Sequence, residues 1–397
     1  MEEAPYLTAD EAAAYLGVSR ATLYAYVSRG LVVSEPLRGS GSRSRRYPRS
    51  ALQELRARRE RRRDPSLNAH EPLNWGRPVL DSALTLIADG DLWYRGRNAR
   101  ELSRTATLEE VACLLWTGTT DGADELFPRS PSRRMPRTGR PFADRLVACL
   151  AERRAESAAT LSEQSPAALR AAARTIRQLF GAAGATGSGT LATRLARGWR
   201  APSADDLNAA LILCADHELN TSSFTARCVA STDAPMHNVL LGALCALEGR
   251  RHGGAASEQV EEFLHDAERN GAGRACHRAL ARNGWLPGFG HRHPVYPRGD
   301  PRADELLSRI ALQSGDPAEQ VIAFARHELG VYPGVDFALV ALARSADLRG
   351  GAAFALFALG RSVGWVAHAL EAAAEGQLIR PRARYVGPVP VPGSAAR

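Results

Sequence analysis

The pattern of apolar and polar positions divides the chain into a short front part and a long helical part. In residues 7–32 (LTADEAAAYLGVSRATLYAYVSRGLV), apolar residues recur at helical spacing in two blocks separated by Gly17 and Val18, with Ser19 as a candidate N-cap of the second. This pattern predicts a helix-turn-helix. From about residue 70 the sequence is rich in alanine and leucine, with long helical periodicity and few alternating strand patterns. It predicts a mainly α-helical domain.

The front part is predicted to combine a small core with a basic outer face. The positions expected to pack its helices are Ala12, Ala13, Leu16, Leu23, Val27 and Leu31. In DNA-binding domains of this kind the second helix lies in the major groove. Residues 37–48 (LRGSGSRSRRYP) would form a wing whose arginines meet phosphates. The candidate DNA-binding residues are Arg20, Thr22, Tyr24, Arg45 and Arg46, with Arg29 also expected to point partly outward.

This unit resembles the winged helix-turn-helix of the MerR and excisionase type, where an arginine-arginine-tyrosine run after the wing is common. Residues 1–65 hold 13 arginines against 8 acidic residues, most of the net charge of +8, and favour duplex DNA as a partner. The alternative is a small protein-docking module whose arginines only solubilise it. Residues 51–65 (ALQELRARRERRRDP) predict an arginine-dense linker helix, so the first domain is expected over residues 1–65 and the second over 66–397.

Composition narrows the function further. All 51 basic residues are arginine, which excludes Schiff-base or other lysine-nucleophile chemistry. Six cysteines occur without a CxxC spacing, so we expect free thiols and neither a disulfide framework nor a metal site. No apolar run approaches the roughly 20 residues that span a bilayer, and the start MEEAP lacks the order of a secretory signal. We therefore expect a cytoplasmic protein that does not contact a membrane.

Residues 287–304 (PGFGHRHPVYPRGDPRAD) form the most polar and chemically equipped loop of the chain. Gly288 and Gly290 would let the backbone approach a ligand. His291 and His293 can each transfer a proton near neutral pH, and Arg302 offers a planar fork to a carboxylate. Taken alone, the loop has a second interpretation as a surface turn with incidental histidines.

Three further residues have a chemical interpretation and a structural alternative. His252, beside two glycines at a predicted helix start, would be kept neutral by the helix dipole; a helix cap with a chance histidine is the alternative. Asp336 precedes an apolar helix, where partial burial would raise its pKa toward that of a general base, although such an aspartate is often an N-cap. Arg361 lies in an apolar helix and needs an anion or an acidic partner.

Together with these positions, several separated segments resemble citrate synthase in the same order across residues 70–390. The segments are YRG (94–96), HELNTSSFTAR (217–227), RHGGA (251–255), the loop 287–304, GVDFALVAL (334–342), LGRSVGWVAH (359–368) and IRPRARYVGP (379–388). The resemblance implies a citrate synthase-like two-domain helical fold, with a large subdomain over about 66–250 and 344–397 and a small one over about 251–343. It also implies a homodimer, because the family's last arginine reaches the neighbouring active site.

The resemblance also assigns roles. Asp336 would take a proton from the methyl group of acetyl-CoA, His252 would stabilise the enol, and His293 would polarise the ketone of oxaloacetate. The residues implied to hold the substrate carboxylates are His217, Arg302, Arg361 and Arg380. The implied enzyme is an acyltransferase that converts the acyl group into an alkyl group on transfer. It uses no metal or cofactor, and CoA is a substrate and product.

Two departures leave alternatives open. His293 keeps the family's nine-residue distance to Arg302, whereas His291 directly follows the glycine turn. A two-residue insertion of histidine and arginine would explain why the loop has two candidates. Ala256 stands where the family usually has asparagine. A 2-methylcitrate synthase that uses propionyl-CoA is a second possibility, because the sequence does not show the pocket volume near one methyl group. A transcription regulator that uses the citrate synthase fold as a metabolite sensor is a third.

Overall fold

The computed structural model divides the chain into two compact units, Met1–Asp81 with Arg382–Arg397, and Ser82–Pro381. Each unit is described by itself. The residues that the structure describes are 6–28, 32, 34–36, 45–49, 52, 55, 80–129, 139–152, 165–250, 252–253, 255–290, 295–296, 299–310, 312, 315–383 and 385–387.

The first unit contains two short helices and a three-stranded antiparallel sheet in the order β1-β3-β2. Its elements are β1 (Tyr6–Leu7), α1 (Ala9–Leu16), α2 (Arg20–Ser28), β2 (Glu35–Pro36) and β3 (Arg45–Pro48). A capping box between Thr8 and Glu11 begins α1, and Gly17, at φ 62°, ends it in the left-handed conformation. The predicted helix-turn-helix is present. Strands β2 and β3 pair antiparallel on either side of residues 37–44, the part of the predicted wing that lies outside the described residues.

The core of this unit confirms most of the predicted positions. Ala12, Ala13, Leu16 and Leu23 are buried, and Val27 packs partly buried against them. Tyr47, which we singled out only as part of the arginine-arginine-tyrosine run, is also fully buried there. Leu31, Arg29 and most of the predicted linker helix lie outside the described residues.

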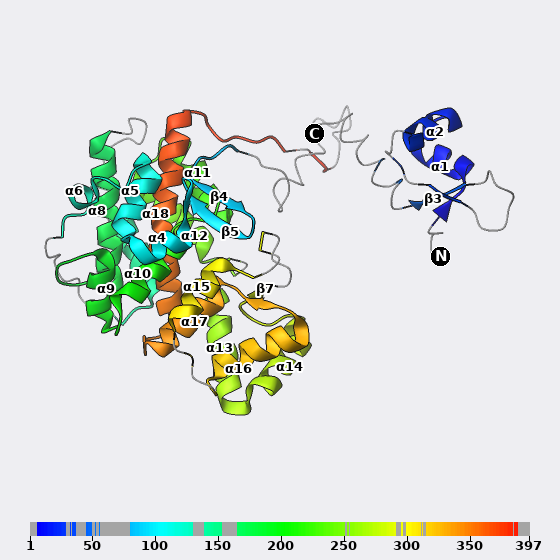
Figure 1. Cartoon of the computed structure of the whole chain (residues 1–397). Coiled ribbons are helices and arrows are strands. Elements are labelled where there is room, and N and C mark those ends of the chain that lie inside the picture. The colour runs from blue at the N-terminus through cyan, green and yellow to red at the C-terminus, as the bar shows by residue number, and fades with distance from the viewer. Residues whose placement is uncertain are drawn as a thin grey trace, which may run out of the picture. The chain divides into compact units, whose positions relative to one another are not determined.

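The second unit is built from helices around one long central helix (Figure 1). Its helices are α4 (Ala99–Thr105), α5 (Leu108–Thr117), α6 (Ala123–Leu126), α7 (Phe142–Glu152), α8 (Pro166–Ala183), α9 (Leu191–Trp199), α10 (Ala204–Leu213), α11 (Thr221–Ala230), α12 (Met236–Leu247), α13 (Ala256–Asn270), α14 (Ala272–Asn283), α15 (Pro301–Arg309), α16 (Pro317–Phe324), the π-helical turn η3 (Ala325–Leu329), α17 (Val335–Ser345) and α18 (Ala352–Glu375). Helices α13 to α17 lie together at one end of this second unit in Figure 1.

Helix α18 is the element against which the site is assembled. It is long and apolar enough to cross a membrane by length and composition, but its apolar window is entirely buried inside the protein. Gly360 and Gly364 let it approach the end of α10 closely. A Cβ atom at Gly360 would lie 2.4 Å from the carbonyl oxygen of Leu211, and one at Gly364 would lie 2.2 Å from that of Ala215. The loop after α10 is thus pressed directly onto α18.

A three-stranded meander, which we did not predict from the sequence, precedes the helices. Strands β4 (Thr85–Ala88), β5 (Asp91–Tyr94) and β6 (Arg97–Asn98) pair antiparallel, with Thr85 opposite Tyr94 and Tyr94 opposite Arg97. Their two-residue turns, 89–90 and 95–96, have positive φ throughout, which suits the twist of a hairpin. The Tyr94 hydroxyl donates to the carbonyl oxygen of Ile212 at 2.9 Å and ties the meander to the end of α10.

A second short pairing, β7 (Phe289–Gly290) with β8 (Tyr332–Pro333), joins the glycine loop to the start of α17. Gly288 has φ 76°, and a Cβ atom there would lie 2.7 Å from Val260 and 2.9 Å from Phe337. We expected this glycine to let the backbone approach a ligand. Within the described residues it instead lets the loop pack against α13 and α17.

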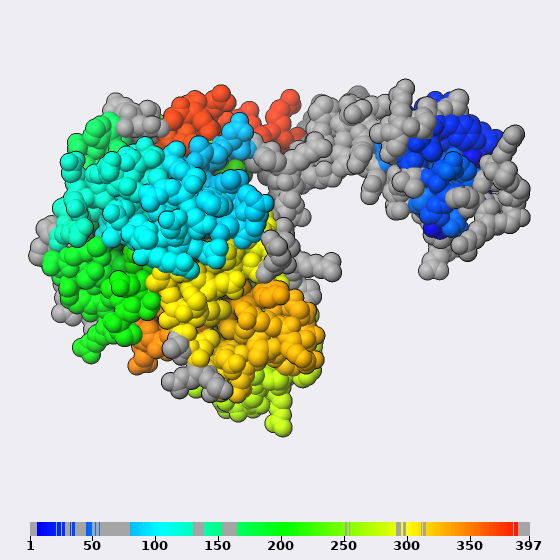
Figure 2. Space-filling view, viewed as in Figure 1, coloured from blue at the N-terminus to red at the C-terminus, as the bar shows by residue number. Residues whose placement is uncertain are grey.

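Helix α15 is fastened to the large group of helices by one buried carboxylate. Glu305, 3% exposed at its side chain, accepts from Nε of Arg104 at 3.0 Å and from Nε of Arg309 at 3.1 Å. Arg309 also donates to the carbonyl oxygen of Ser103. These contacts join α15 to α4, and in Figure 2 the corresponding yellow and cyan surfaces lie against each other.

Glu305→Gln is expected to destabilise the folded protein by about 1–3 kcal/mol, because it removes the charge from two charge-assisted hydrogen-bond pairs made by a buried side chain. The measurement is the midpoint of thermal unfolding followed by circular dichroism. Glu262→Gln, an exposed site on α13, is the matched control. Equal midpoints for the two variants would contradict this role of Glu305.

Candidate active site

The predicted chemical residues converge on the buried guanidinium of Arg361, in the middle of α18. Arg361 is 1% exposed, donates from Nε to the carbonyl oxygen of Cys214 at 2.8 Å, and lies 4.7 Å from the ring centroid of Phe357. From the sequence we expected it to need an anion or an acidic partner. Among the described residues it forms no ion pair, and its favourable electrostatic neighbour is the buried Asp216. Its terminal nitrogens are therefore suited to a bound anion.

His252 lies in the turn before α13, and its Nε2 atom is 3.0 Å from Oγ of Ser222, the second residue of α11. Nε1 of Trp365 donates to the same Oγ at 3.2 Å. Burial, aided by the nearby charge of Arg361, lowers the pKa of His252 to about 4. The neutral imidazole was predicted, but its cause was not. Helix α13 begins four residues later, at Ala256, so burial and a like charge take the place of the helix dipole.

Asp336 is the second residue of α17, and Gly334 is the N-cap. The N-cap alternative is therefore wrong for this aspartate. Its side chain is partly buried, and among the described residues its carboxylate has no hydrogen-bond partner. Burial raises its pKa to about 6; the negative charge of Asp300 adds to the rise, and Arg302 and Arg361 oppose it. A carboxylate of this kind can accept a proton near neutral pH.

Arg302, 4% exposed, lies in the first turn of α15 and is paired with Asp300. Its Nε and Nη2 atoms donate to the two carboxylate oxygens of Asp300 at 2.9 and 2.8 Å. From the sequence we expected this fork to be open to a substrate carboxylate. The structure shows that one side of it is already occupied. Asp300 itself was missed, although an aspartate before a proline is a typical helix-start signal.

His217 lies in the loop between α10 and α11. Its Nε2 atom is 3.0 Å from the hydroxyl oxygen of Tyr296, and the two rings meet edge to face. The guanidinium of Arg302 lies 5.6 Å from the centroid of the same tyrosine ring. Tyr296 thus links two of the predicted substrate-binding residues, a connection that sequence spacing alone did not reveal.

Asp216 anchors this loop beneath the site. It is fully buried, 3.2 Å from Nε2 of His368 on α18, and it accepts from the hydroxyl of Thr85 at 2.5 Å. Burial alone would raise its pKa, but His368, Arg361 and Thr85 together hold it below the usual value. The loop that carries His217 is consequently joined to the helix that carries Arg361.

Three predicted site residues remain, and only Arg380 is among the described residues. His291 and His293 lie outside the described residues, so the choice between them stays open. Arg380 is exposed beyond the end of α18. Ile379 donates to Oγ of Ser231, at the far end of α11 from Ser222. Glu375, the last residue of α18, is 14 residues beyond Arg361, about 21 Å along a helix.

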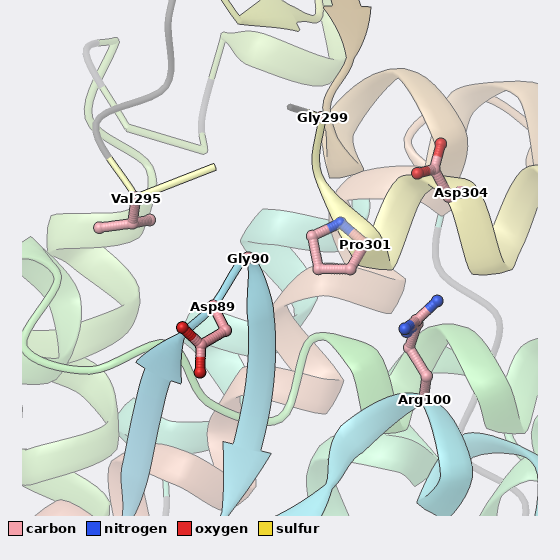
Figure 3. A pocket seen from close by; sticks show the side chains of 7 residues that line it. All are labelled: Asp89, Gly90, Arg100, Val295, Gly299, Pro301 and Asp304. Carbon is pink, nitrogen blue, oxygen red and sulfur yellow. The ribbon is translucent and has the colours of Figure 1, made fainter. Parts of the chain in front are cut away.

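A pocket of about 520 Å³ opens beside the loop that leads into α15. Figure 3 shows its lining from three elements: the β4–β5 turn with Asp89 and Gly90, α4 with Arg100, and the α15 region with Pro301 and Asp304. No residue of the cluster around Arg361 lines it. Among the described residues, no group of three or more histidines, cysteines or carboxylates could hold a metal ion.

In the first unit, the predicted DNA-binding side chains differ in how they are engaged. Arg20 bonds the Tyr24 hydroxyl and lies 3.2 Å from Asp10, all at exposed positions, while Thr22 is bonded to Ser19. Arg46 is less available than expected, because it pairs with Glu35 at 2.7 Å and lies over the ring of Tyr6. Arg45, its neighbour in β3, is exposed.

A helix-turn-helix unit and a helical domain with a buried cluster of arginine, histidine and aspartate define the class of this protein. Residues 144–382 match the family model described as citrate synthase, C-terminal domain, and residues 6–60 match that of a helix-turn-helix domain. The chain belongs to the citrate synthase family, with a helix-turn-helix domain at its N-terminal end.

Relatives and solved structures agree with this assignment. The chain is 37% identical over 207 residues to citrate synthase of Saccharolobus solfataricus, covering 48% of this chain and 54% of the relative. It is 35% identical over 189 residues to citrate synthase 2 of Bacillus subtilis, covering 46% and 50%. The chain thus spans about half the length of these relatives.

Among solved structures, it resembles the ternary complex of Thermoplasma acidophilum citrate synthase with carboxymethyl coenzyme A and oxaloacetate, with 26% identity, a TM-score of 0.66, and coverage of 82% of this chain and 97% of that one. Citrate synthase of Thermotoga maritima, at 24% identity, a TM-score of 0.64 and coverage of 80% and 95%, supports the fold alone. The predicted citrate synthase-like helical fold is confirmed.

Proposed function

We propose that this chain catalyses the condensation of acetyl-CoA with oxaloacetate to citrate and CoA. The observation that carries the proposal is that His252 and Asp336, whose pKa values are shifted by burial, both lie near the buried guanidinium of Arg361. Arg361, which is buried and forms no ion pair among the described residues, lies within electrostatic reach of the neutral imidazole of His252 and of the carboxylate of Asp336, whose pKa is raised. Such a set can bind an anion, stabilise an enol and remove a proton from carbon.

In the proposed reaction, Asp336 accepts a proton from the methyl carbon of acetyl-CoA while His252 donates a hydrogen bond to the thioester oxygen. In the structure the Ser222 hydroxyl donates to Oδ1 of Asn220 at 2.7 Å and accepts from Trp365. For Nδ1 of His252 to carry that proton, the hydroxyl must turn from Asn220 and donate to Nε2 instead. The enol carbon then attacks the ketone of oxaloacetate, which His293, or its rival His291, polarises. Water finally cleaves the thioester and releases CoA.

Oxaloacetate is a dianion, and the proposed binding residues supply its countercharge. Arg302 and Arg361 would take its carboxylates, with His217 as a hydrogen-bonding neighbour held by Tyr296. The proposal needs no metal or cofactor, because these side chains provide the positive field, and CoA enters as a substrate. All six cysteines lie among the described residues and none forms a disulfide, which suits a reducing compartment such as the cytoplasm.

Arg380 supports a homodimer in this proposal. Its position beyond the end of α18, far along the helix from Arg361, is unsuited to the site of its own chain. Reaching the active site of a second copy is the role that the family resemblance implies for it.

The experiment that tests the proposed function is release of CoA thiol from acetyl-CoA, measured with and without oxaloacetate. We expect release that depends on oxaloacetate and yields citrate by mass spectrometry. Competition between acetyl-CoA and propionyl-CoA separates this reaction from a 2-methylcitrate synthase. A folded protein that binds oxaloacetate but releases no thiol with either thioester would overturn the enzyme and favour a metabolite-sensing regulator, which the helix-turn-helix domain would serve.

We further propose that residues 1–65 bind duplex DNA through α2 and the wing. The support is the helix-turn-helix fold, the exposed Arg20, Tyr24 and Arg45, and the arginine excess of this region. A protein-docking role is the outcome to exclude.

The double variant Arg45→Ala/Arg46→Ala is expected to bind duplex DNA more weakly, and the slope of log affinity against log salt should fall by about 1 for each phosphate that is no longer neutralised. Since Arg46 is paired with Glu35, most of the weakening should appear in Arg45→Ala alone. The measurement is fluorescence anisotropy across a salt series, with the exposed Arg274→Ala as a charge-matched control. An unchanged salt slope in the double variant would contradict the wing interpretation.

A further inference from the structure

One carboxylate, that of Asp300, connects the two helices that carry the proposed base and a proposed substrate-binding arginine. Asp300 is 5% exposed and is the N-cap of α15. Its Oδ1 atom accepts from the backbone nitrogen of Arg302 at 3.0 Å and from Nε of Arg302 at 2.9 Å. Its Oδ2 atom accepts from Nη2 of Arg302 at 2.8 Å and from the backbone nitrogen of Val335 at 3.2 Å.

The bond to Val335 supplies a cap that α17 lacks. The N-cap of α17 is Gly334, which has no side chain to satisfy the first backbone N–H groups of the helix. Gly334 is held in turn by a bond from its nitrogen to the carbonyl oxygen of Gly288 at 2.8 Å. Asp300 therefore caps α15 directly and α17 from a distance, and the residue after Val335 is Asp336.

The bond to Arg302 restricts how that arginine can act. With Nε and Nη2 engaged, the guanidinium plane is fixed, and within the part of the chain that the structure describes Nη1 remains for a ligand. The negative charge of Asp300 also lies close enough to Asp336 to contribute to its raised pKa, after burial. Geometry and charge thus both join the two functional residues to Asp300.

We propose that Asp300 is a positioning residue for both substrates, because it orients Arg302 for a carboxylate of the oxo acid and holds the start of α17 where Asp336 meets the thioester methyl. The inference rests on the proposed function, whose residues it connects. It assigns to Asp300 an effect on oxo-acid binding and on proton abstraction together.

The test compares Asp300→Asn and Asp300→Glu with Asp316→Asn in the full chain. Asp316 is a matched control, because it also precedes a proline and caps a helix, accepting from the backbone nitrogen of Ala318 at 2.7 Å, but it belongs to α16. In Asp300→Asn we expect KM for oxaloacetate to rise and kcat to fall, each on the order of 10- to 100-fold, since small misplacements of reacting groups have effects of this size.

The acidic limb of the pH profile should also move to lower pH in Asp300→Asn, because a negative charge beside Asp336 is removed. Asp300→Glu should recover part of the change in KM and kcat. Asp316→Asn should lower the unfolding temperature without changing KM or the pH profile. If Asp300→Asn lowers only the unfolding temperature, as Asp316→Asn does, Asp300 is a helix cap and the proposal is overturned.

Calorimetric binding of oxaloacetate separates this proposal from the proposed function. If the wild-type protein binds oxaloacetate but releases no thiol, the condensation fails as a function, and weaker binding by Asp300→Asn still supports the orientation of Arg302. Equal affinities of the wild type and Asp300→Asn for oxaloacetate would overturn the proposed role of Asp300. A wild-type protein that neither binds oxaloacetate nor releases thiol would overturn both.

Discussion

Asp336→Asn is expected to lower the rate of oxaloacetate-dependent thiol release by about 10²- to 10⁴-fold, the usual contribution of a positioned general base. The amide keeps the shape of the side chain but cannot accept the methyl proton. The measurement is steady-state kcat at pH 7 to 8, with the exposed Asp205→Asn on α10 as the matched control. A rate within a few-fold of the wild type would show that another group removes the proton.

The pH dependence provides a second readout for the same residue. Because the pKa of Asp336 is raised to about 6, the wild-type rate should increase as the pH rises through 6 and level off above it. The ordinary pKa of an aspartate in an unfolded chain is about 3.9, so ionisation of Asp336 disfavours the folded state. The stability that protonated Asp336 contributes is therefore lost as the pH rises from about 4 to 6. Asp336→Asn should be at least as stable as the wild type at pH 7, which separates impaired chemistry from impaired folding.

His252→Asn is expected to lower kcat by about 10²- to 10³-fold, the effect of removing one donor from a developing oxyanion. The proposed site of this effect is the thioester, so KM for oxaloacetate should change little. Because the pKa of His252 is lowered to about 4, the imidazole stays neutral above that pH, and no limb of the profile between pH 5 and 8 should belong to it. His265→Asn, exposed on α13, is the control.

A rise in KM for oxaloacetate with an unchanged kcat in His252→Asn would contradict this assignment, since it would place the imidazole on the other substrate. Ser222→Ala should cause a smaller decrease in kcat, because it removes only the hydroxyl that orients Nε2.

The parts of the fold with strong local signals were predictable from the sequence. Apolar spacing, Ser19 and the glycine after Leu16 were enough for the helix-turn-helix, and the long apolar stretch around Arg361 was enough for α18. The meander was not, because its strands of two to four residues are too short for a clear alternation. Its turns, with Gly90 and Gly96, were the available signal.

The sequence indicated the candidate residues of the site better than it indicated the contacts between them. His252, Asp336 and Arg361 were found from local context and family resemblance, and the directions of the pKa of His252 and Asp336 were predicted from helix position and burial. Asp300 had a local signal, since it precedes a proline, but its bond to Val335 crosses 35 residues, and Tyr296 contacts His217 across 79 residues. Local spacing indicates neither of these two contacts. The pairing of Arg46 with Glu35 was hidden for the same reason, because the register of β2 with β3 sets it.

If Asp336, His252 and the two arginines surround a single pair of substrates, as we propose, a ternary complex will show it. The most direct test is a crystal structure of the full chain with oxaloacetate and a non-reactive thioether analogue of acetyl-CoA. We expect oxaloacetate carboxylates within hydrogen-bond distance of Arg302 and Arg361, with the carbon that replaces the methyl group between Asp336 and His252. Ligands bound elsewhere, or Asp336 and His252 on opposite sides of an empty cluster, would contradict the proposed reaction.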